Sequence, residues 1–155
     1  MANKKKEEEQ SDFKYIVRMA NTDLDGEKTV IIGLTSIKGI GHRTARNIVK
    51  KAGAPPREKL GNLSDDHINK LKEMVEDVPA ISPIWMLNRR KDYETGDDRH
   101  IISTEVSMQL KDDINLLKKA RCYRGIRHEN GHKVRGQRTR SNGRTGLTLG
   151  VSKSK

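Results

Sequence analysis

The net positive charge of this chain is confined to its last quarter, a segment with too few apolar residues to build a core. The chain has 155 residues, with 32 Lys and Arg against 21 Asp and Glu. From Lys118 to Lys155 there are twelve basic residues and one acid, Glu129, so residues 1–117 carry 20 charges of each sign. Charge segregated in this way costs self-repulsion and indicates a polyanionic partner. The sequence therefore predicts a neutral folded body followed by a cationic segment that becomes ordered on binding.

The composition of the whole chain predicts a small core. Hydrophobic residues make up 32% and aromatic residues 3%, whereas an ordinary globular domain is about 45–50% apolar. The single cysteine, Cys122, excludes an intramolecular disulfide and is compatible with a reducing cytoplasm. The first residues lack the apolar centre of a secretion signal, and no apolar run approaches the ~20 residues of a membrane span. Residues 125–146 contain only two aliphatic residues, too few for a membrane-inserting face, so nucleic acid is the favoured polyanion.

The N-terminal part of the body has weak structural signals. Residues 1–12 are charged and are predicted to be disordered. Residues 13–20 are predicted to be extended, and the Asn, Asp and Gly content of residues 21–26 predicts a turn. Apolar residues at helical spacing favour a helix over Lys28–Ile37, although the β-branched run Thr29–Ile32 is locally compatible with a strand.

Two further helices are predicted in the body. Residues 41–52 carry one apolar stripe and end at Gly53, which is followed by a Pro-Pro pair. Ser64 can cap the next helix, two aspartates then occupy the first turn where the helix dipole favours them, and Pro79 ends it. The predicted buried residues of this helix are Ile68, Leu71, Val75 and Val78.

The clearest helix is predicted over Ser103–Ala120. Before it come an apolar cluster at residues 83–87, expected to pack on the preceding helix, and a loop at residues 93–98. One side of the helix is lined by Val106, Leu110, Ile114 and Leu117. From Tyr123 onward glycines interrupt every apolar pattern, which predicts an extended segment.

The predicted fold is therefore mainly α. It has a charged leader (residues 1–12), a helical body (13–102), a long C-terminal helix (103–122) and an extended basic arm (123–155), called the C-terminal arm below.

The first candidate nucleic-acid site is the segment Ile37–Gly41 between two predicted helices. Its two glycines permit the backbone to approach a phosphate closely, and the positive N-terminal dipole of the following helix adds to the attraction. A tight helix–helix turn with a solvated basic face is the alternative interpretation. The candidate contacts are Lys38, Gly39, Gly41, His42, Arg43 and Arg46.

The second candidate site is the C-terminal arm. Arginine bonds phosphate in a bidentate manner, and Tyr123 can stack on a base. A solubilising tail is a weaker explanation, because such tails are usually Lys-rich or acidic. Folded RNA is favoured over duplex DNA because its irregular pockets suit an Arg-rich segment that orders on binding. The candidate contacts are Arg121, Tyr123, Arg124, Arg127, His128, Lys133, Arg135, Gln137, Arg138, Arg140, Asn142 and Arg144.

Three motifs in the last third of the chain resemble one family. RCYRGIRH at residue 121, VRGQRT at residue 134 and SNGRT at residue 141 closely resemble the C-terminal signature of the universal small-subunit ribosomal protein of the thirteen family. LTSIKGIGHRTA at residue 34 resembles its N-terminal signature, and EVSM at residue 105 resembles the start of its long helix. The long segment at residues 85–102 resembles the archaeal and eukaryotic branch, since bacterial members are shorter there.

The resemblance implies a helix–two-turns–helix domain in the head of the small subunit and a structural role without enzymatic activity. It also implies rRNA binding by the hairpin and the arm, a neighbouring small-subunit protein of the nineteen family, and a bridge to the large subunit that includes its protein of the five family. In the family the C-terminal tail approaches the peptidyl-site tRNA. Unlike the dense basic end of bacterial members, residues 146–155 carry only Lys153 and Lys155, which are the expected tRNA contacts. The expected location is the cytoplasmic ribosome.

Metal and catalytic sites are disfavoured by the spacing of the reactive residues. Cys122, His128 and His132 lack the fourth ligand and the paired cysteines of a zinc site, so no metal or cofactor is predicted. His67 and His100 are expected at the surface or at helix ends. Adjacent aspartates diverge and form no acid–base pair, no P-loop motif is present, and Cys122 has no evident general base.

The sequence disfavours two rival functions. A DNA-repair glycosylase would need a reactive N-terminal proline and usually four zinc-binding cysteines, whereas this chain begins Met-Ala and has one cysteine. A DNA-compacting protein is argued against by the arm signature, and a competition between DNA and rRNA would decide.

Overall fold

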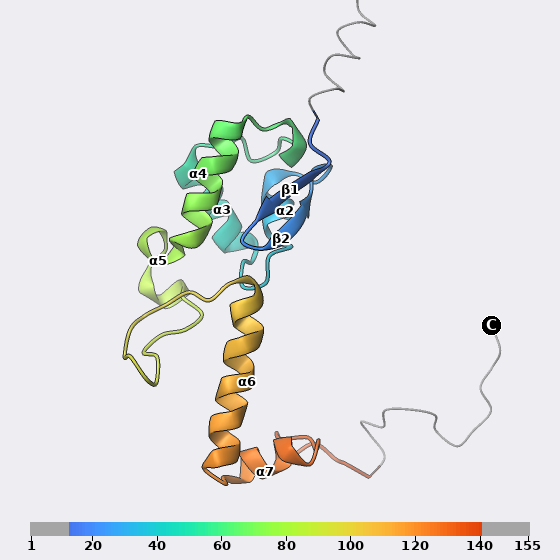
Figure 1. The fold of residues 1–155 in the computed structure, drawn as a ribbon, viewed down its shortest axis with the longest axis vertical. Coiled ribbons are helices and arrows are strands. Elements are labelled where there is room, and N and C mark those ends of the chain that lie inside the picture. The colour runs from blue at the N-terminus through green and yellow to red at the C-terminus, as the bar shows by residue number, and fades with distance from the viewer. Residues whose placement is uncertain (1–12, 141–155) are drawn as a thin grey trace, which may run out of the picture. The chain divides into compact units, whose positions relative to one another are not determined.

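Residues 13–140 are described by the computed structural model, which is mainly helical as predicted (Figure 1). The elements in order are β1 (Ile16–Met19), β2 (Thr22–Asp25), α2 (Val30–Leu34), α3 (His42–Ala52), the 3-10 turn η1 (Leu60–Asn62), α4 (Asp65–Glu76), α5 (Val78–Ile81), the 3-10 turn η2 (Ile84–Met86), α6 (Ser103–Lys119) and α7 (Tyr123–Glu129). The chain divides into two compact units, Met1–Ser107 and Met108–Lys155. The predictions for residues 1–12, Asn142, Arg144, Lys153 and Lys155 lie outside the described residues.

Strands β1 and β2 form an antiparallel hairpin in which Ile16 is opposite Asp25 and Met19 is opposite Thr22. Both residues of the connecting turn, Ala20 and Asn21, have left-handed φ angles of 44° and 56°, as in the tight turns that join twisted strands. The prediction of an extended piece before residue 20 is confirmed. The predicted turn over residues 21–26 is wrong, because most of that segment pairs with β1.

The core of the first unit forms where α2, α3 and α4 meet the hairpin. The buried apolar residues are Val17, Met19, Leu24, Val30, Leu34, Ile37, Ile40, Ala45, Ile48, Val49, Ala52, Ala54, Leu60, Leu63, Ile68, Leu71, Val75 and Val78. The helix predicted from residue 28 is confirmed but short, since α2 has five residues and Thr29 instead forms a bridge with Lys59. Gly53 ends α3 with a φ of 68°, as predicted.

Helix α4 begins after Ser64 with two aspartates in its first turn, as predicted, although the Ser64 side chain makes no capping hydrogen bond in the structure. The four residues predicted to be buried on this helix are all buried, although Val78 lies on α5. The prediction that Pro79 ends this helix is wrong. Helix α4 ends at Glu76, and Pro79 lies in the first turn of α5, where proline is tolerated because its missing N–H has no helical partner there.

The apolar cluster after α5 does not pack as predicted. Ile84 is 62% exposed and Trp85 is 73% exposed, whereas Leu87 alone of the three is buried. The following residues form a loop that includes the predicted one at 93–98. Among the described residues, no helix is long and apolar enough to cross a membrane.

The second unit contains most of α6 and all of α7. Helix α6 begins at Ser103 as predicted, but its apolar residues remain at least partly exposed, with Leu110 59% and Met108 64% exposed. The structure shows helix α7 where the sequence predicts the start of an extended arm, so that prediction is wrong for Tyr123–Glu129. From Asn130 to Arg140 the described chain has neither helix nor strand.

Gly125 permits the close packing of α7 against the end of α6. A Cβ at this position would lie 2.1 Å from the Leu117 carbonyl oxygen, so only glycine lets α7 pack against the end of α6. The Cys122 sulfur accepts a hydrogen bond from the Gly125 N–H at 3.4 Å, and the thiol donates to the Leu117 carbonyl at 3.4 Å. The glycine that breaks the apolar pattern of the sequence is therefore a packing position.

Candidate RNA interface

The six residues of the first candidate site lie together at the turn between α2 and α3. The buried side chains of Ile37 and Ile40 anchor the turn to the hydrophobic core, and the Ile40 N–H donates to the Ile37 carbonyl at 3.1 Å. This anchoring leaves the remaining turn residues and the first turn of α3 at the surface. Lys38, Gly39, Gly41, His42, Arg43 and Arg46 are all exposed.

The two glycines of the turn have different reasons to be glycine. Gly39 has a φ of 95°, and a Cβ there would lie 2.4 Å from the Ile101 carbonyl oxygen. Gly41 has an ordinary φ of −93°, and a Cβ there would meet no described atom within 4 Å. Gly39 is thus required by the chain's own backbone rather than by a ligand, which corrects the sequence-based explanation. Gly41 leaves an open face beside the N-terminus of α3.

Residues 88–102, called the docked loop, hold the turn in place. The His100 Nε2 lies 3.0 Å from the Gly39 carbonyl oxygen, and the Ser103 N–H donates to the Lys38 carbonyl at 2.7 Å. The Asn88 side chain closes the base of the loop by bonding both the Ile101 carbonyl (2.7 Å) and the Ile101 N–H (2.8 Å). The His100 contact joins residues 61 apart in the sequence.

His100, predicted at the surface or at a helix end, is half-buried in the docked loop three residues before the start of α6. Its Nδ1 lies 3.4 Å from the Asn88 N–H, and a neutral ring with the proton on Nε2 satisfies both contacts. Burial lowers the pKa of His100 below its usual value, and the hydrogen bond to the Gly39 carbonyl opposes this shift. The neutral form of His100 is therefore the one that fits the docked loop.

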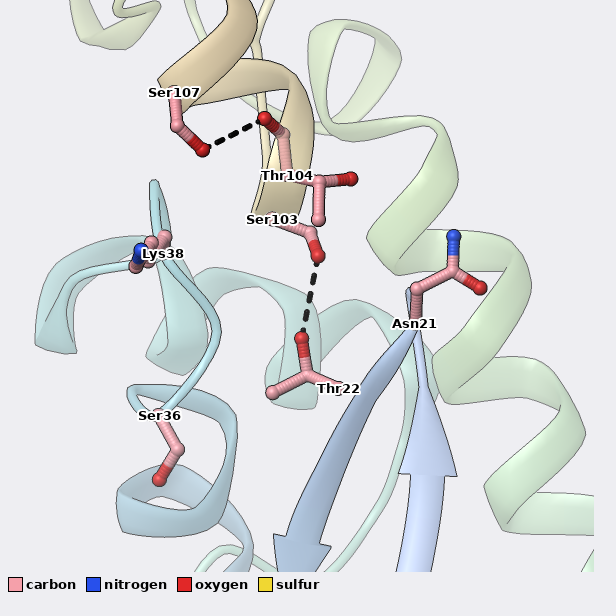
Figure 2. A pocket seen from close by; sticks show the side chains of 7 residues that line it. All are labelled: Asn21, Thr22, Ser36, Lys38, Ser103, Thr104 and Ser107. Carbon is pink, nitrogen blue, oxygen red and sulfur yellow. Dashed lines mark hydrogen bonds between the residues drawn. The ribbon is translucent and has the colours of Figure 1, made fainter.

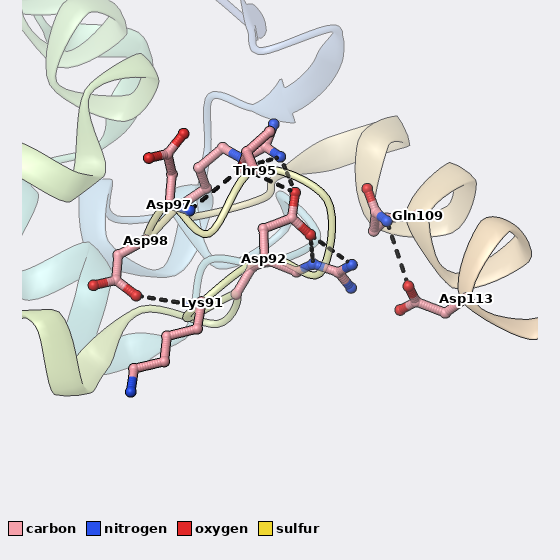
Figure 3. A network of polar contacts seen from close by, with 9 residues as sticks. Lys91, Asp92, Thr95, Asp97, Asp98, Gln109 and Asp113 are labelled. Carbon is pink, nitrogen blue, oxygen red and sulfur yellow. Dashed lines mark hydrogen bonds and ion pairs between the residues drawn. The ribbon is translucent and has the colours of Figure 1, made fainter. Parts of the chain in front are cut away.

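A buried carboxylate organises the tip of the docked loop (Figure 3). Asp92 accepts a hydrogen bond from Arg89 at 2.8 Å and forms an ion pair with Arg99. The two arginines face each other across a short antiparallel bridge, with N–H···O distances of 3.1 and 2.7 Å. The Arg89 hydrogen bond lowers the pKa of Asp92, with further lowering from Arg99 against the opposing effect of desolvation. The loop predicted at residues 93–98 lies between Asp92 and Arg99, and the sequence did not predict this ion-pair network.

The second candidate site begins on α7 and continues to Arg140. Tyr123 is 72% exposed at the start of α7, and Arg124 is exposed beside it. Arg127 is half-buried and its Nε donates to the Lys133 carbonyl at 3.0 Å, so it folds the chain back. Arg121 lies 3.4 Å from Glu129 at the surface.

The remaining predicted residues of this site follow α7. The Arg135 N–H donates to Gln137 Oε1 at 3.1 Å, which stabilises a turn next to Gly136 with its φ of 72°. His128 is half-buried, whereas the others are exposed: Lys133, Arg135, Gln137, Arg138 and Arg140. Within residues 13–140, no three His, Cys, Asp or Glu side chains are arranged to hold a metal ion.

Comparison with known proteins identifies the family. The chain matches the family described as ribosomal protein S13/S18 over residues 18–145. It is 50% identical over 149 residues to the small ribosomal subunit protein uS13 of Methanocella arvoryzae, covering 96% of this chain and 66% of that protein. It is 49% identical to the uS13 of Thermoplasma volcanium, covering 97% and 88%, and 52% identical to that of Archaeoglobus fulgidus, covering 92% and 98%.

These relatives are archaeal, in agreement with the branch that the segment at residues 85–102 predicts. Ribosomal proteins of this family are structural and not enzymes, which confirms the prediction that the chain has no catalytic role. The match over most of the chain, at about half identity to several relatives, shows that it belongs to the ribosomal protein S13/S18 family.

Proposed function

We propose that this chain is a constituent of the small ribosomal subunit head that binds rRNA through the hairpin turn and through α7 with the residues after it. The observation that carries this proposal is the open face of Gly41. No described part of the chain occupies that face, and exposed cations surround it. Family membership supports rRNA as the ligand, since the relatives are small ribosomal subunit proteins.

At the turn, rRNA phosphate is proposed to lie against the start of α3. Gly41 precedes this helix and makes no side-chain cap, so the first N–H groups of α3 have no capping partner from that residue. An anion at this position is stabilised by those N–H groups and by the helix dipole. Lys38, Arg43 and Arg46 add charge on the same exposed segment.

In the second unit, the proposed contacts combine stacking and charge. Tyr123 offers an exposed ring to a base, and Arg124 can bond a phosphate beside it. The exposed cations from Lys133 to Arg140 release counterions from RNA when they bind. Arg127 contributes by shaping the turn after α7, since its guanidinium is bonded to the Lys133 carbonyl.

The finer partners are proposals that rest on the family. They are a neighbouring small-subunit protein of the nineteen family, the large-subunit protein of the five family across the intersubunit bridge, and the peptidyl-site tRNA. Lys153 and Lys155 are the proposed tRNA contacts, with Asn142 and Arg144 assigned to rRNA. The proposed location is the ribosome in the cytoplasm, without a cofactor.

The proposal is tested by binding the full chain to a transcript of the small-subunit head rRNA over a series of salt concentrations. The test variant is Arg135→Ala, Arg138→Ala, Arg140→Ala, and the control of equal charge change is Arg57→Ala, Lys70→Ala, Lys72→Ala. Because each phosphate contact contributes about 0.7–0.9 to the slope of log affinity against log salt, the test variant is expected to lower the slope by about 2–3. The control is expected to change it little.

Two results would contradict the proposal. Unchanged affinity and slope in the test variant would exclude these arginines as rRNA contacts. Preference for duplex DNA over the rRNA transcript in direct competition would instead support a DNA-compacting function.

A further inference from the structure

Two adjacent apolar side chains of the 3-10 turn η2 are open to solvent. Ile84 is 62% exposed and Trp85 is 73% exposed. An aromatic side chain buries about 150–250 Å² when it is covered, and tryptophan is enriched among the residues that carry most of the binding energy of interfaces. This exposed pair is therefore a candidate surface for a partner.

The backbone of η2 presents the exposed indole in a fixed place. The Met86 N–H donates to the Pro83 carbonyl at 2.9 Å. The Leu87 N–H donates to the Ile84 carbonyl at 3.2 Å. Ser82 and Leu87, on either side of the turn, are each 7% exposed. Because the turn is already ordered, little backbone freedom would be lost when a partner covers it.

The same turn borders a basic helix. The Asn47 side-chain nitrogen donates to the Met86 sulfur at 3.6 Å, which joins η2 to α3. Arg43 and Lys50 lie one helical turn before and after Asn47 and are exposed. Helix α3 contains no acidic residue, and residues 78–88 carry no charged side chain. The charges nearest to η2 on α3 are therefore all positive.

Another side of the α2–α3 turn, next to the start of α6, is occupied by contacts within the chain (Figure 2). There the Thr22 and Ser103 hydroxyls lie 3.3 Å apart, and the Ser107 hydroxyl donates to the Thr104 carbonyl at 2.9 Å. These hydroxyls already have partners in the fold. The exposed cations that follow the turn in the chain are those of α3.

We infer that Trp85 stacks on an unpaired base of an RNA strand whose phosphates follow the basic face of α3. The inference rests on the proposed rRNA binding and extends it from the open face of Gly41 to η2. Asn47, which contacts η2, is six residues after Gly41, or about 9 Å along the helix axis, so one short strand can reach both. A nucleotide combines a flat base with a negative charge, which suits an exposed indole beside Arg43 and Lys50.

Because Trp85 is the single tryptophan of the chain, its fluorescence reports on this site alone. The full chain is titrated with hexauridylate, a single-stranded RNA. The same ribose–phosphate strand without bases, and hexaglutamate as an acidic peptide, are titrated in parallel. A base stacked on an indole quenches its emission, so hexauridylate is expected to give saturable quenching that the strand without bases does not give. Lys50→Gln is expected to lower the slope of log affinity against log salt by about 0.7.

The contribution of the ring is measured as affinity for the transcript of the small-subunit head rRNA. Trp85→Ala is expected to weaken this affinity at least about fivefold, whereas Trp85→Phe keeps an aromatic face and should retain most of it. The matched control is Tyr93→Ala, which removes another exposed aromatic ring, 78% exposed in the docked loop, and should leave the affinity unchanged.

Absence of quenching at saturating hexauridylate, or equal quenching by the strand without bases, would overturn the inference. Unchanged rRNA affinity in Trp85→Ala, an equal loss in Tyr93→Ala, or a saturable response to hexaglutamate alone would also overturn it. Quenching by hexauridylate without binding of the rRNA transcript would refute the proposed function while leaving Trp85 as a stacking site. Binding of the transcript with unchanged Trp85 fluorescence would refute only the stacking site.

Discussion

Replacing Gly39 with alanine tests whether this glycine serves the docked loop rather than a ligand. The new Cβ would lie 2.4 Å from the Ile101 carbonyl oxygen at a φ of 95°. A left-handed φ costs a residue with a Cβ roughly 1–2 kcal/mol, and overpacking against backbone typically costs about 1–3 kcal/mol more. The free energy of unfolding is therefore expected to fall by about 2–5 kcal/mol.

Gly41→Ala is the matched comparison on the same turn. Its Cβ would enter open space at an allowed φ, so the expected cost is only about 0.5 kcal/mol from a poorer N-cap. That Cβ would, however, occupy the face proposed to meet an rRNA phosphate. Gly41→Ala is therefore expected to weaken rRNA binding several-fold while the chain stays folded.

Thermal unfolding followed by circular dichroism separates the two variants. For a chain of this length, 1 kcal/mol shifts Tm by about 2–4 °C, so Gly39→Ala should lower Tm by at least about 4 °C and Gly41→Ala by about 1–2 °C. Affinity for the rRNA transcript is then measured well below both transitions. A Tm for Gly39→Ala within 2 °C of the parent, or unchanged rRNA affinity in Gly41→Ala, would refute the different roles assigned to the two glycines.

Three further changes probe the docked loop and α7. The pKa of Asp92 is lowered from the usual 3.8, so its ion pairs stabilise the fold above that pH and this stabilisation should be lost as pH falls below 4. Hydrogen exchange in the docked loop should therefore become faster below pH 4. Asp92→Asn should abolish this pH dependence. The pKa of His100 is also lowered, so stability should fall as pH drops below the usual value of 6.5, and NMR titration of the ring should give a midpoint below that value. Gly125→Ala should displace α7, because its Cβ would lie 2.1 Å from the Leu117 carbonyl, and far-UV circular dichroism should show less helix. Gly131→Ala, with a φ of 67° but no atom in the way, should keep α7 intact.

Local patterns in the sequence predict much of the body. The apolar spacing of residues 41–52 predicts α3 because helical periodicity depends only on neighbouring residues, and the left-handed Gly53 ends the helix as predicted. The burial of Ile68, Leu71 and Val75 follows from the same spacing on α4. The six candidate residues of the turn also lie together as predicted, because they are close in the chain.

The errors arise where pairing or packing with another segment decides the structure. Thr22–Asp25 forms a strand because it pairs with β1, a contact that local turn composition does not reveal. Tyr123–Glu129 forms a helix in which Gly125 lies against the Leu117 carbonyl, although the glycines of this region suggest an extended chain. The contact of the His100 ring with the Gly39 carbonyl was not predicted, since the two residues lie 61 positions apart in the sequence.

By itself, the sequence determined three features: the division between a neutral body and a basic end, the helices of the body, and the residues of the α2–α3 turn. It did so because charge and periodicity are properties of contiguous residues. The tertiary structure alone decided why Gly39 is glycine and why burial lowers the pKa of His100. Each of these depends on the docked loop returning to the turn about 60 residues away. Such a contact comes from packing and hydrogen-bond geometry between segments that no local pattern links.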